Sequence, residues 1–282
     1  MTLSAVPNPI RLTCLVDNAA RPHSAFRTEH GLAILVEVGA GRVLFDAAAS
    51  GDVLFHNLEV LGVDPQTIAA VALSHAHRDH TGGLPALLQR RPGLPVYAHS
   101  DILRERFSHR DGQMRSVGLP LSADALRRQA DLHLSRAPQE ILPGVWTSGE
   151  IAHRSEPEGR SNRHFIRQGD AWSADPYTDD QALLLHGESG LVLLCGCCHA
   201  GLLNTLFHVR EHFGRYPVAV VGGTHLVDAD EADVRRVAVA LQDMGLTDVY
   251  PNHCTGESAY IGMALVLGAR VGPFPAGAVL EL

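Results

Sequence analysis

The chain has 282 residues, 45% of them hydrophobic, and a formal net charge of −8 at pH 7. This is enough for a sizeable core in one large domain or two small ones, and the acidic balance argues against a nucleic-acid interface. The sequence contains no run of about 18 apolar residues that could cross a membrane and no signal-peptide pattern, so we expect a cytoplasmic protein without nucleic-acid or membrane partners.

The first hundred residues alternate short apolar runs with helical patterns. The apolar runs predict β-strands and lie at residues 33–38, 43–45, 68–73 and 96–98. Helical patterns lie over residues 50–61, ended by Gly62, and over residues 84–91. Strand–helix–strand order of this kind predicts a layered α/β architecture.

The middle of the chain has a different composition. Residues 153–180 are polar and rich in turn-forming residues, which indicates a long loop or lid. We therefore expect a single domain over residues 1–282 with a peripheral insertion or lid at about 100–180.

Three apolar strands of the second half each lead into a turn that carries a histidine. The strands lie at residues 190–194, 217–221 and 248–250, and the histidines are His199, His225 and His253. Helical patterns over about 200–213 and 229–244 separate the strands.

A metal-ligand pattern follows the strand at residues 68–73. In His75-Ala-His77-Arg-Asp79-His80, two imidazoles two residues apart project to the same side of an extended backbone, while the Asp-His pair points elsewhere. The pattern predicts two adjacent metal positions, with imidazole and carboxylate ligands that suit zinc. Four ligands cannot complete two ions, so the histidines at the later strand ends are the candidates for the remainder.

Each of these later histidines has an alternative interpretation. His199 and His253 are either ligands or structural hydrogen-bonding groups, and His225 is a ligand, a substrate contact or a structural group. The five cysteines include Cys195 and Cys198, which form either a redox pair or, as we expect, buried unreactive thiols.

These motifs resemble the metallo-β-lactamase superfamily, whose first metal motif is similar to residues 74–83. Within this superfamily, the chain is most similar to the branch typified by dihydropterin-ribofuranosylaminobenzene-phosphate synthase. The similar segments are residues 29–32, 44–46, 148–151, 179–183, 196–204, 222–226 and 253–256. The resemblance implies an αββα sandwich, in which two facing β-sheets are covered by outer helices and metals are held in loops at one sheet edge.

The resemblance also implies roles for individual residues. His75 and His77 would hold a first metal, Asp79 and His80 would serve a second, and His253 would be the last ligand. The family pattern has a histidine where this chain has Glu150, so Glu150 replaces that ligand or the position is lost. It has a bridging aspartate where this chain has Gly196-Cys197, so Cys197 or His199 takes that place. The number of ions, one or two, is left open.

We expect a metal-dependent hydrolase that acts on an ester, phosphoester or lactone of a small molecule, with zinc as the ion and manganese, iron or magnesium as alternatives. Asp79 and His225 are the catalytic candidates, and Arg163 and Arg167 are the candidates for binding an anionic substrate. The alternative is a synthase that joins a dihydropterin methyl diphosphate to an arylamine ribofuranosyl phosphate. A redox sensor and a nuclease are weaker alternatives. The sequence does not predict an oligomeric state.

Overall fold

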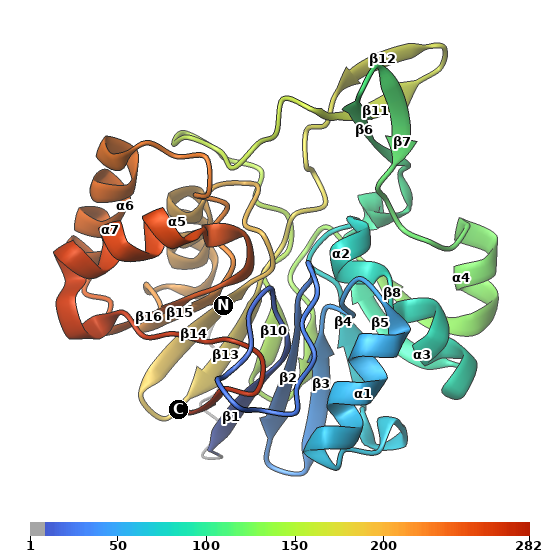
Figure 1. Cartoon of the computed structure of the whole chain (residues 1–282), viewed down its shortest axis with the longest axis horizontal. Helices are drawn as coiled ribbons and strands as arrows, with labels where there is room; N and C mark the ends of the chain where they lie inside the picture. Colours follow the sequence, from blue (N-terminus) through green and yellow to red (C-terminus); the bar gives the residue numbers. More distant parts are fainter. Residues whose placement is uncertain (1–8) are drawn as a thin grey trace.

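The computed structural model describes residues 9–282. The first eight residues of the expected domain lie outside this range. Two β-sheets face each other, one of seven strands and one of six (Figure 1). The first has the order β17-β1-β2-β3-β4-β5-β8, with β1 at Ile10–Val16, β2 at Ala33–Val38, β3 at Gly41–Phe45, β4 at Ala70–Ala72, β5 at Leu94–Ala98, β8 at Ala130–Leu134 and β17 at Val279–Glu281.

The second sheet has the order β16-β15-β14-β13-β10-β9. Its strands are β9 at Glu140–Leu142, β10 at Val145–Thr147, β13 at Leu183–Gly187, β14 at Gly190–Cys195, β15 at Ala219–Gly222 and β16 at Asp248–Pro251. Strands β14, β15 and β16 pair in parallel, as do β3, β4 and β5 in the first sheet. Each sheet therefore has a set of neighbouring strands whose carboxyl ends meet at one edge.

Helices cover the outer faces of both sheets (Figure 1). On the first sheet they are α1 at Gly51–Leu61, α3 at Leu84–Arg90 and α4 at Ala123–Gln129, and on the second α5 at Leu202–Phe213, α6 at Glu231–Asp243 and α7 at Glu257–Leu267. The short α2, at Arg78–Thr81, lies in the loop after β4. Short 3-10 turns lie at Pro65–Thr67, Ser100–Leu103, His253–Thr255 and Gly268–Arg270. None of the helices in the described part of the chain has both the length and the apolar character needed to span a membrane.

Three layers of apolar side chains hold this arrangement together. The cluster between the sheets joins Ile34 and Phe45 to Leu185, Val192 and Val221. A second cluster packs the first sheet against α1 and α3, and a third packs the second sheet against α5, α6 and α7. Because each sheet is apolar on both faces, it needs a neighbour on each side. The predicted αββα sandwich is confirmed.

The predicted helix at 50–61 is present, and the residues at its two ends explain why it could be predicted from sequence. Ser50 caps α1 and accepts a hydrogen bond from the backbone N–H of Val53, and Gly62 ends the helix with a φ of 72°. A side-chain acceptor at the first position and a left-handed glycine after the last are the usual helix boundaries. Both ends of the helix could therefore be predicted from the residue types at these positions.

The middle of the chain differs from expectation. Residues 153–180 contain strands β11 at His164–Gln168 and β12 at Ala171–Ala174, which form a four-stranded sheet with β6 at Arg106–Arg110 and β7 at Gln113–Ser116. This small sheet protrudes above the sandwich (Figure 1). Its strands are mostly solvent-exposed and lack the alternating apolar pattern that predicts a half-buried strand. Residues 130–147 instead contribute β8, β9 and β10 to the two main sheets.

Candidate metal centre

The candidate ligands lie in loops that follow strands of both sheets. β4 leads into residues 75–80 on the first sheet. On the second sheet, β14 leads to Cys197 and His199, β15 to His225 and β16 to His253. Because the carboxyl ends of parallel strands meet at one edge, residues far apart in sequence are brought to one place.

Two groups of potential ligands result. His75, His77 and His199 form the first group. Asp79, His80, Cys197 and His253 form the second, and within each group the ligand atoms lie within 4.8 Å of one another. In the first group His75 Nε2 lies 3.0 Å from His77 Nδ1, and in the second His80 Nε2 lies 3.1 Å from both Cys197 Sγ and His253 Nε2.

The donor sets fit metal ions. The Nε2 atoms of His77 and His199 are buried and have no hydrogen-bond partner. An unpaired polar atom in the interior costs about 1–3 kcal/mol unless something satisfies it. Imidazole, carboxylate and thiolate are the ligands that zinc takes. The first group would hold one ion and the second group another.

Burial keeps the imidazoles of the first group in the form that binds metals. It lowers the pKa values of His75, His77 and His199 well below the ordinary value. In the second group burial lowers the pKa of His253 to about 4. Neutral imidazole has a free electron pair on one ring nitrogen. These four rings are therefore available as ligands at neutral pH.

Charge is concentrated on two residues of the second group. Burial opposes the charge on His80, but the carboxylates of Asp79 and Asp46 outweigh it and raise the pKa of His80 to about 9. Burial likewise opposes the charge of Asp79, but His80 and His253 hold the pKa of its carboxyl well below the ordinary value. Burial raises the pKa of the Cys197 thiol, so a bound cation is what would hold this group as a thiolate.

The second nitrogen of several ligand rings is fixed by a hydrogen bond. His80 Nδ1 lies 2.7 Å from Asp46 Oδ2, and His199 Nδ1 lies 2.6 Å from the carbonyl oxygen of Gly159. Further contacts join His75 Nδ1 to Ser74 Oγ at 2.8 Å and His253 Nδ1 to Asn18 Oδ1 at 3.2 Å. Such partners fix ring orientation and tautomer in metal sites, so the Nε2 atoms of these rings face the two groups.

Backbone strain is concentrated at the same edge of the sandwich. Six of the eight non-glycine residues with positive φ in the described range lie in the loops of this site: Asp46, Ala48, Tyr177, Cys198, His225 and His253. Each such conformation costs on the order of 1–3 kcal/mol and persists only when the surroundings impose it. The loops are therefore held in conformations that their own backbone does not favour, as is common where side chains must converge.

A buried arginine supports the first ligand loop from below. The side chain of Arg106 is 1% exposed and contacts Asp175 at 2.9 Å and Asp179 at 2.7 Å. The second oxygen of Asp179 accepts a hydrogen bond of 2.9 Å from the backbone N–H of Ala76. Because Ala76 lies between His75 and His77, this network connects the protruding sheet to the ligand loop.

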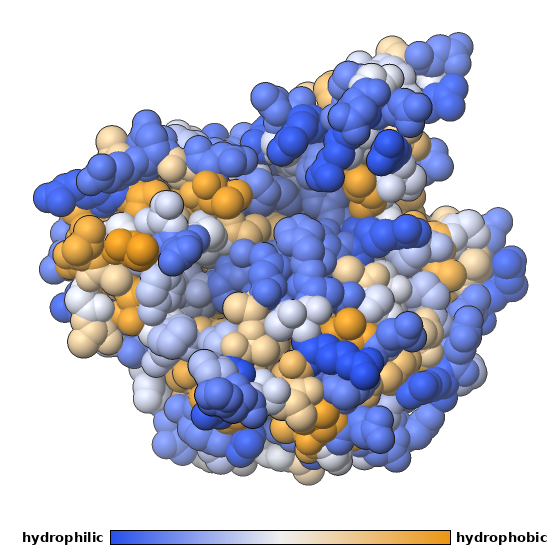
Figure 2. Space-filling model, viewed as in Figure 1, coloured by the Kyte–Doolittle hydropathy of each residue, from blue (hydrophilic) through white to orange (hydrophobic). Residues whose placement is uncertain are grey.

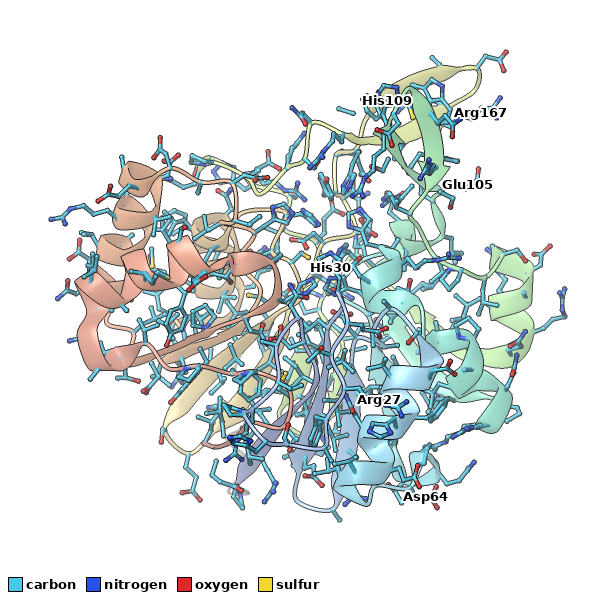
Figure 3. All side chains as sticks on the ribbon, viewed as in Figure 1. Arg27, His30, Asp64, Glu105, His109 and Arg167 are labelled. Carbon is cyan, nitrogen blue, oxygen red and sulfur yellow. The ribbon has the colours of Figure 1, made fainter. Side chains whose placement is uncertain are left out.

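Two of the predicted site residues lie elsewhere. Glu150 is bonded to Arg136 and to His99 Nε2, and it joins neither ligand group of the described residues. Arg136 lowers the pKa of Glu150 and forms an ion pair with its carboxylate in the segment after β10. Arg167 contacts Asp170 near the far end of the protruding sheet (Figure 3). The predictions for both residues are corrected.

Other predicted residues line a single pocket. A cavity of about 460 Å³ is bordered by members of both ligand groups and by His225 and Arg163. The ring of His225 lies 4.4 Å from that of His199. Figure 2 shows a largely hydrophilic hollow on this face, below the protruding sheet. A cavity of this size suits a small molecule.

Sequence reasoning gave Tyr177 and His30 no role in the site, and it considered His164 only as a contact for an anionic substrate. Tyr177 stacks on His199 with ring centres 4.0 Å apart, and its hydroxyl lies 2.8 Å from His164 Nδ1. The ring of His164 is 4.7 Å from that of His77. His30 lies 3.5 Å from Asp79, in the middle of the face seen in Figure 3. The resemblance at residues 29–32 was the one signal for His30, and no spacing pattern indicates Tyr177 or the contact of His164 with His77, because only the fold brings these rings together.

All five cysteines are free and buried, and Cys198 Sγ lies 3.3 Å from the Thr205 hydroxyl. A hydrogen bond with Cys198, together with burial, raises the pKa of the Cys195 thiol well above its ordinary value. This environment agrees with buried, unreactive thiols at Cys195 and Cys198.

Comparison with known proteins gives a consistent result. The chain is 31% identical, over 271 residues and 92% of each chain, to the 7,8-dihydropterin-6-methyl-4-(β-D-ribofuranosyl)-aminobenzene-5′-phosphate synthase of Methanocaldococcus jannaschii. A solved structure described as a metal-dependent hydrolase of the beta-lactamase superfamily is 28% identical, covers 97% of this chain and 99% of its own, and has a TM-score of 0.82. The family model of the metallo-beta-lactamase superfamily matches residues 27–170. The chain therefore belongs to the metallo-β-lactamase superfamily.

Proposed function

We propose that this protein is a zinc-dependent hydrolase that cleaves a phosphoester of a small anionic molecule, with esters and lactones as the other substrates this site could accept. The observation that carries the proposal is the convergence of His75, His77 and His199, two of whose Nε2 atoms are buried without a partner, beside a second complete ligand group. Two neighbouring ions at the base of one pocket are the usual arrangement for hydrolysis of phosphate esters.

Zinc held by these groups would polarise a substrate oxygen and make water a nucleophile near neutral pH. The carboxylate of Asp79 stays charged at that pH and faces the pocket, where it can accept a hydrogen bond from the attacking water and orient it. Burial lowers the pKa of His225, so this ring is neutral and can donate a hydrogen bond to the substrate or accept a proton as a general base.

The second candidate is a transferase, and the 31% identity to the named synthase over 92% of the chain favours it. In that reaction an arylamine replaces water as the attacking group, and a diphosphate leaves. The same ligand groups serve both reactions. A diphosphate leaving group would favour magnesium, whereas the imidazole-rich groups favour zinc, manganese or iron.

Metal content separates the two candidates. We expect the protein purified without chelator to hold two equivalents of a transition metal and to hydrolyse phosphodiesters. Replacing Cys197 by alanine should remove one equivalent, because only the second group contains this thiol. Elemental analysis of both proteins, with assays on model phosphoesters, is the measurement. A protein without transition metal that is active only with magnesium, an arylamine and a diphosphate substrate would contradict the hydrolase.

A further inference from the structure

Three arginines border the outer part of the pocket: Arg78, Arg110 and Arg163. They come from separate segments, the start of α2, the end of β6 and the residue before β11. None of the three guanidinium groups forms an ion pair or a side-chain hydrogen bond with another described residue. We call these residues the arginine rim. Three unpaired guanidinium groups beside one cavity favour an anionic ligand, because guanidinium matches phosphate in shape and charge.

The rim is distinct from the metal centre. None of its members belongs to either ligand group. The ring of His164, which follows Arg163 in the chain, packs against the ligand His77 with ring centres 4.7 Å apart. A group bound at the rim is therefore a different group from one bound at the metals.

The carboxylates of the pocket do not neutralise the rim. They are Asp79 and Asp228. Asp79 lies 3.6 Å from His80 and 3.4 Å from His253, which places its charge in the second ligand group. Asp228 follows Val227 in the loop between β15 and α6, and no ion pair joins it to any arginine among the described residues. The positive charge of the arginine rim is therefore available to bind an anionic ligand.

The rim is also held in position. The backbone N–H of Arg78 donates a hydrogen bond of 2.8 Å to the carbonyl oxygen of Val117, which joins the first ligand loop to the segment after β7. The carbonyl oxygen of Arg163 accepts a hydrogen bond of 2.8 Å from the backbone N–H of His109, next to Arg110. Val117 and Val227 border the same pocket and give it apolar walls.

We propose that the arginine rim is a second anion subsite, and that the substrate carries a phosphate monoester separated by an uncharged segment from the group that reacts at the metal centre. This inference rests on the proposed function only in placing the substrate in the same pocket. The rim phosphate anchors the molecule, and the apolar walls contact the segment between its two charged ends.

Calorimetric binding to the metal-loaded protein tests the proposal without requiring turnover. The probes are fructose 1,6-bisphosphate and fructose 6-phosphate. We expect the unaltered protein to bind the bisphosphate at least about tenfold more tightly, because charge-assisted hydrogen bonds contribute this much each. The double variant Arg110→Gln, Arg163→Gln should lose this preference, while its affinity for the monophosphate stays within about twofold. Arg167→Gln, on the same small sheet but away from the pocket, is the matched control and should behave as the unaltered protein.

Two outcomes would contradict the proposal that the arginine rim is an anion subsite. One is equal affinity of the unaltered protein for the two probes, and the other is an equal loss of affinity for both probes in the double variant, which would mean that the arginines only attract anions in general. Failure of the proposed function gives a different result. If the protein hydrolyses no phosphoester but still prefers the bisphosphate through Arg110 and Arg163, the anion subsite is supported and the hydrolase proposal is wrong.

Discussion

Replacing His77 by alanine is expected to remove the ion of the first ligand group and to lower kcat/KM for phosphoester hydrolysis by about three orders of magnitude or more. The physical reason is that bound zinc would lower the pKa of water to about 7, and without it little nucleophile exists at neutral pH. His77 is buried, its Nε2 has no other partner, and only His75 and His199 remain in its group. Elemental analysis and steady-state kinetics measure the two effects.

The matched control for His77→Ala is His109→Ala, at the far end of the protruding sheet (Figure 3). It should keep the full metal content and the kinetic constants of the unaltered protein. Retention of both metal equivalents by His77→Ala would show that this residue is not a ligand, and the assignment of the first group would have to be abandoned.

Replacing Arg106 by methionine is expected to lower the free energy of unfolding by about 3–5 kcal/mol, because two buried carboxylates lose their counter-charge. Asp175 and Asp179 are 2% and 1% exposed, so water cannot compensate. Asp179 also holds the backbone of Ala76. We therefore expect metal affinity to fall about 10–100-fold, as when an outer-shell partner of a ligand is lost. Urea unfolding in chelator and competition with a chromogenic chelator measure the two quantities.

Arg104→Met controls for this change. Arg104 pairs with Asp101 at 2.8 Å, as Arg106 does at 3.3 Å, but its side chain is 40% exposed. An exposed pair contributes at most about 1 kcal/mol. Similar losses of stability in the two variants would mean that the Arg106 network does not support the ligand loop.

The stability loss in Arg106→Met should also depend on pH. Burial already raises the pKa of Asp175 although Arg106 opposes the shift, and without the arginine the folded-state pKa of Asp175 lies further above its unfolded value. A raised carboxyl pKa favours folding at low pH, and this contribution is lost as pH rises through the folded-state pKa. The difference in stability between the variant and the unaltered protein should therefore be smaller at pH 5 than at pH 8. A difference that grows toward low pH would exclude unpaired carboxylates as the cause.

The part of the centre that could be predicted from sequence depends on short-range geometry. Residues 75–80 place four ligands in one strand-to-turn segment, so spacing alone indicates their chemistry. His199 and His253 were found because each follows an apolar strand, and parallel strands deliver their ends to one edge. The helices were found from capping residues such as Ser50 and Gly62.

What could not be predicted depends on contacts between distant segments. His164 reaches the pocket because β11 pairs with β6, which is more than fifty residues earlier, and both strands are too polar to show a strand pattern. Tyr177 and Asp46 act on ligand rings only through tertiary contacts. Glu150 was placed in the site by its position in a motif, but the position of Arg136 decides where its carboxylate lies.

The second ligand group combines Asp79 and His80 with Cys197 and His253. During synthesis at about 5–20 residues per second, His253 is made on the order of ten seconds or more after His80. Until Cys197 and His199 are made, the early ligands have no partners from the second sheet, and the second group stays incomplete until His253 follows. The centre is therefore assembled after translation of nearly the whole chain, and metal loading in the cell is expected to follow the docking of the second sheet onto the first.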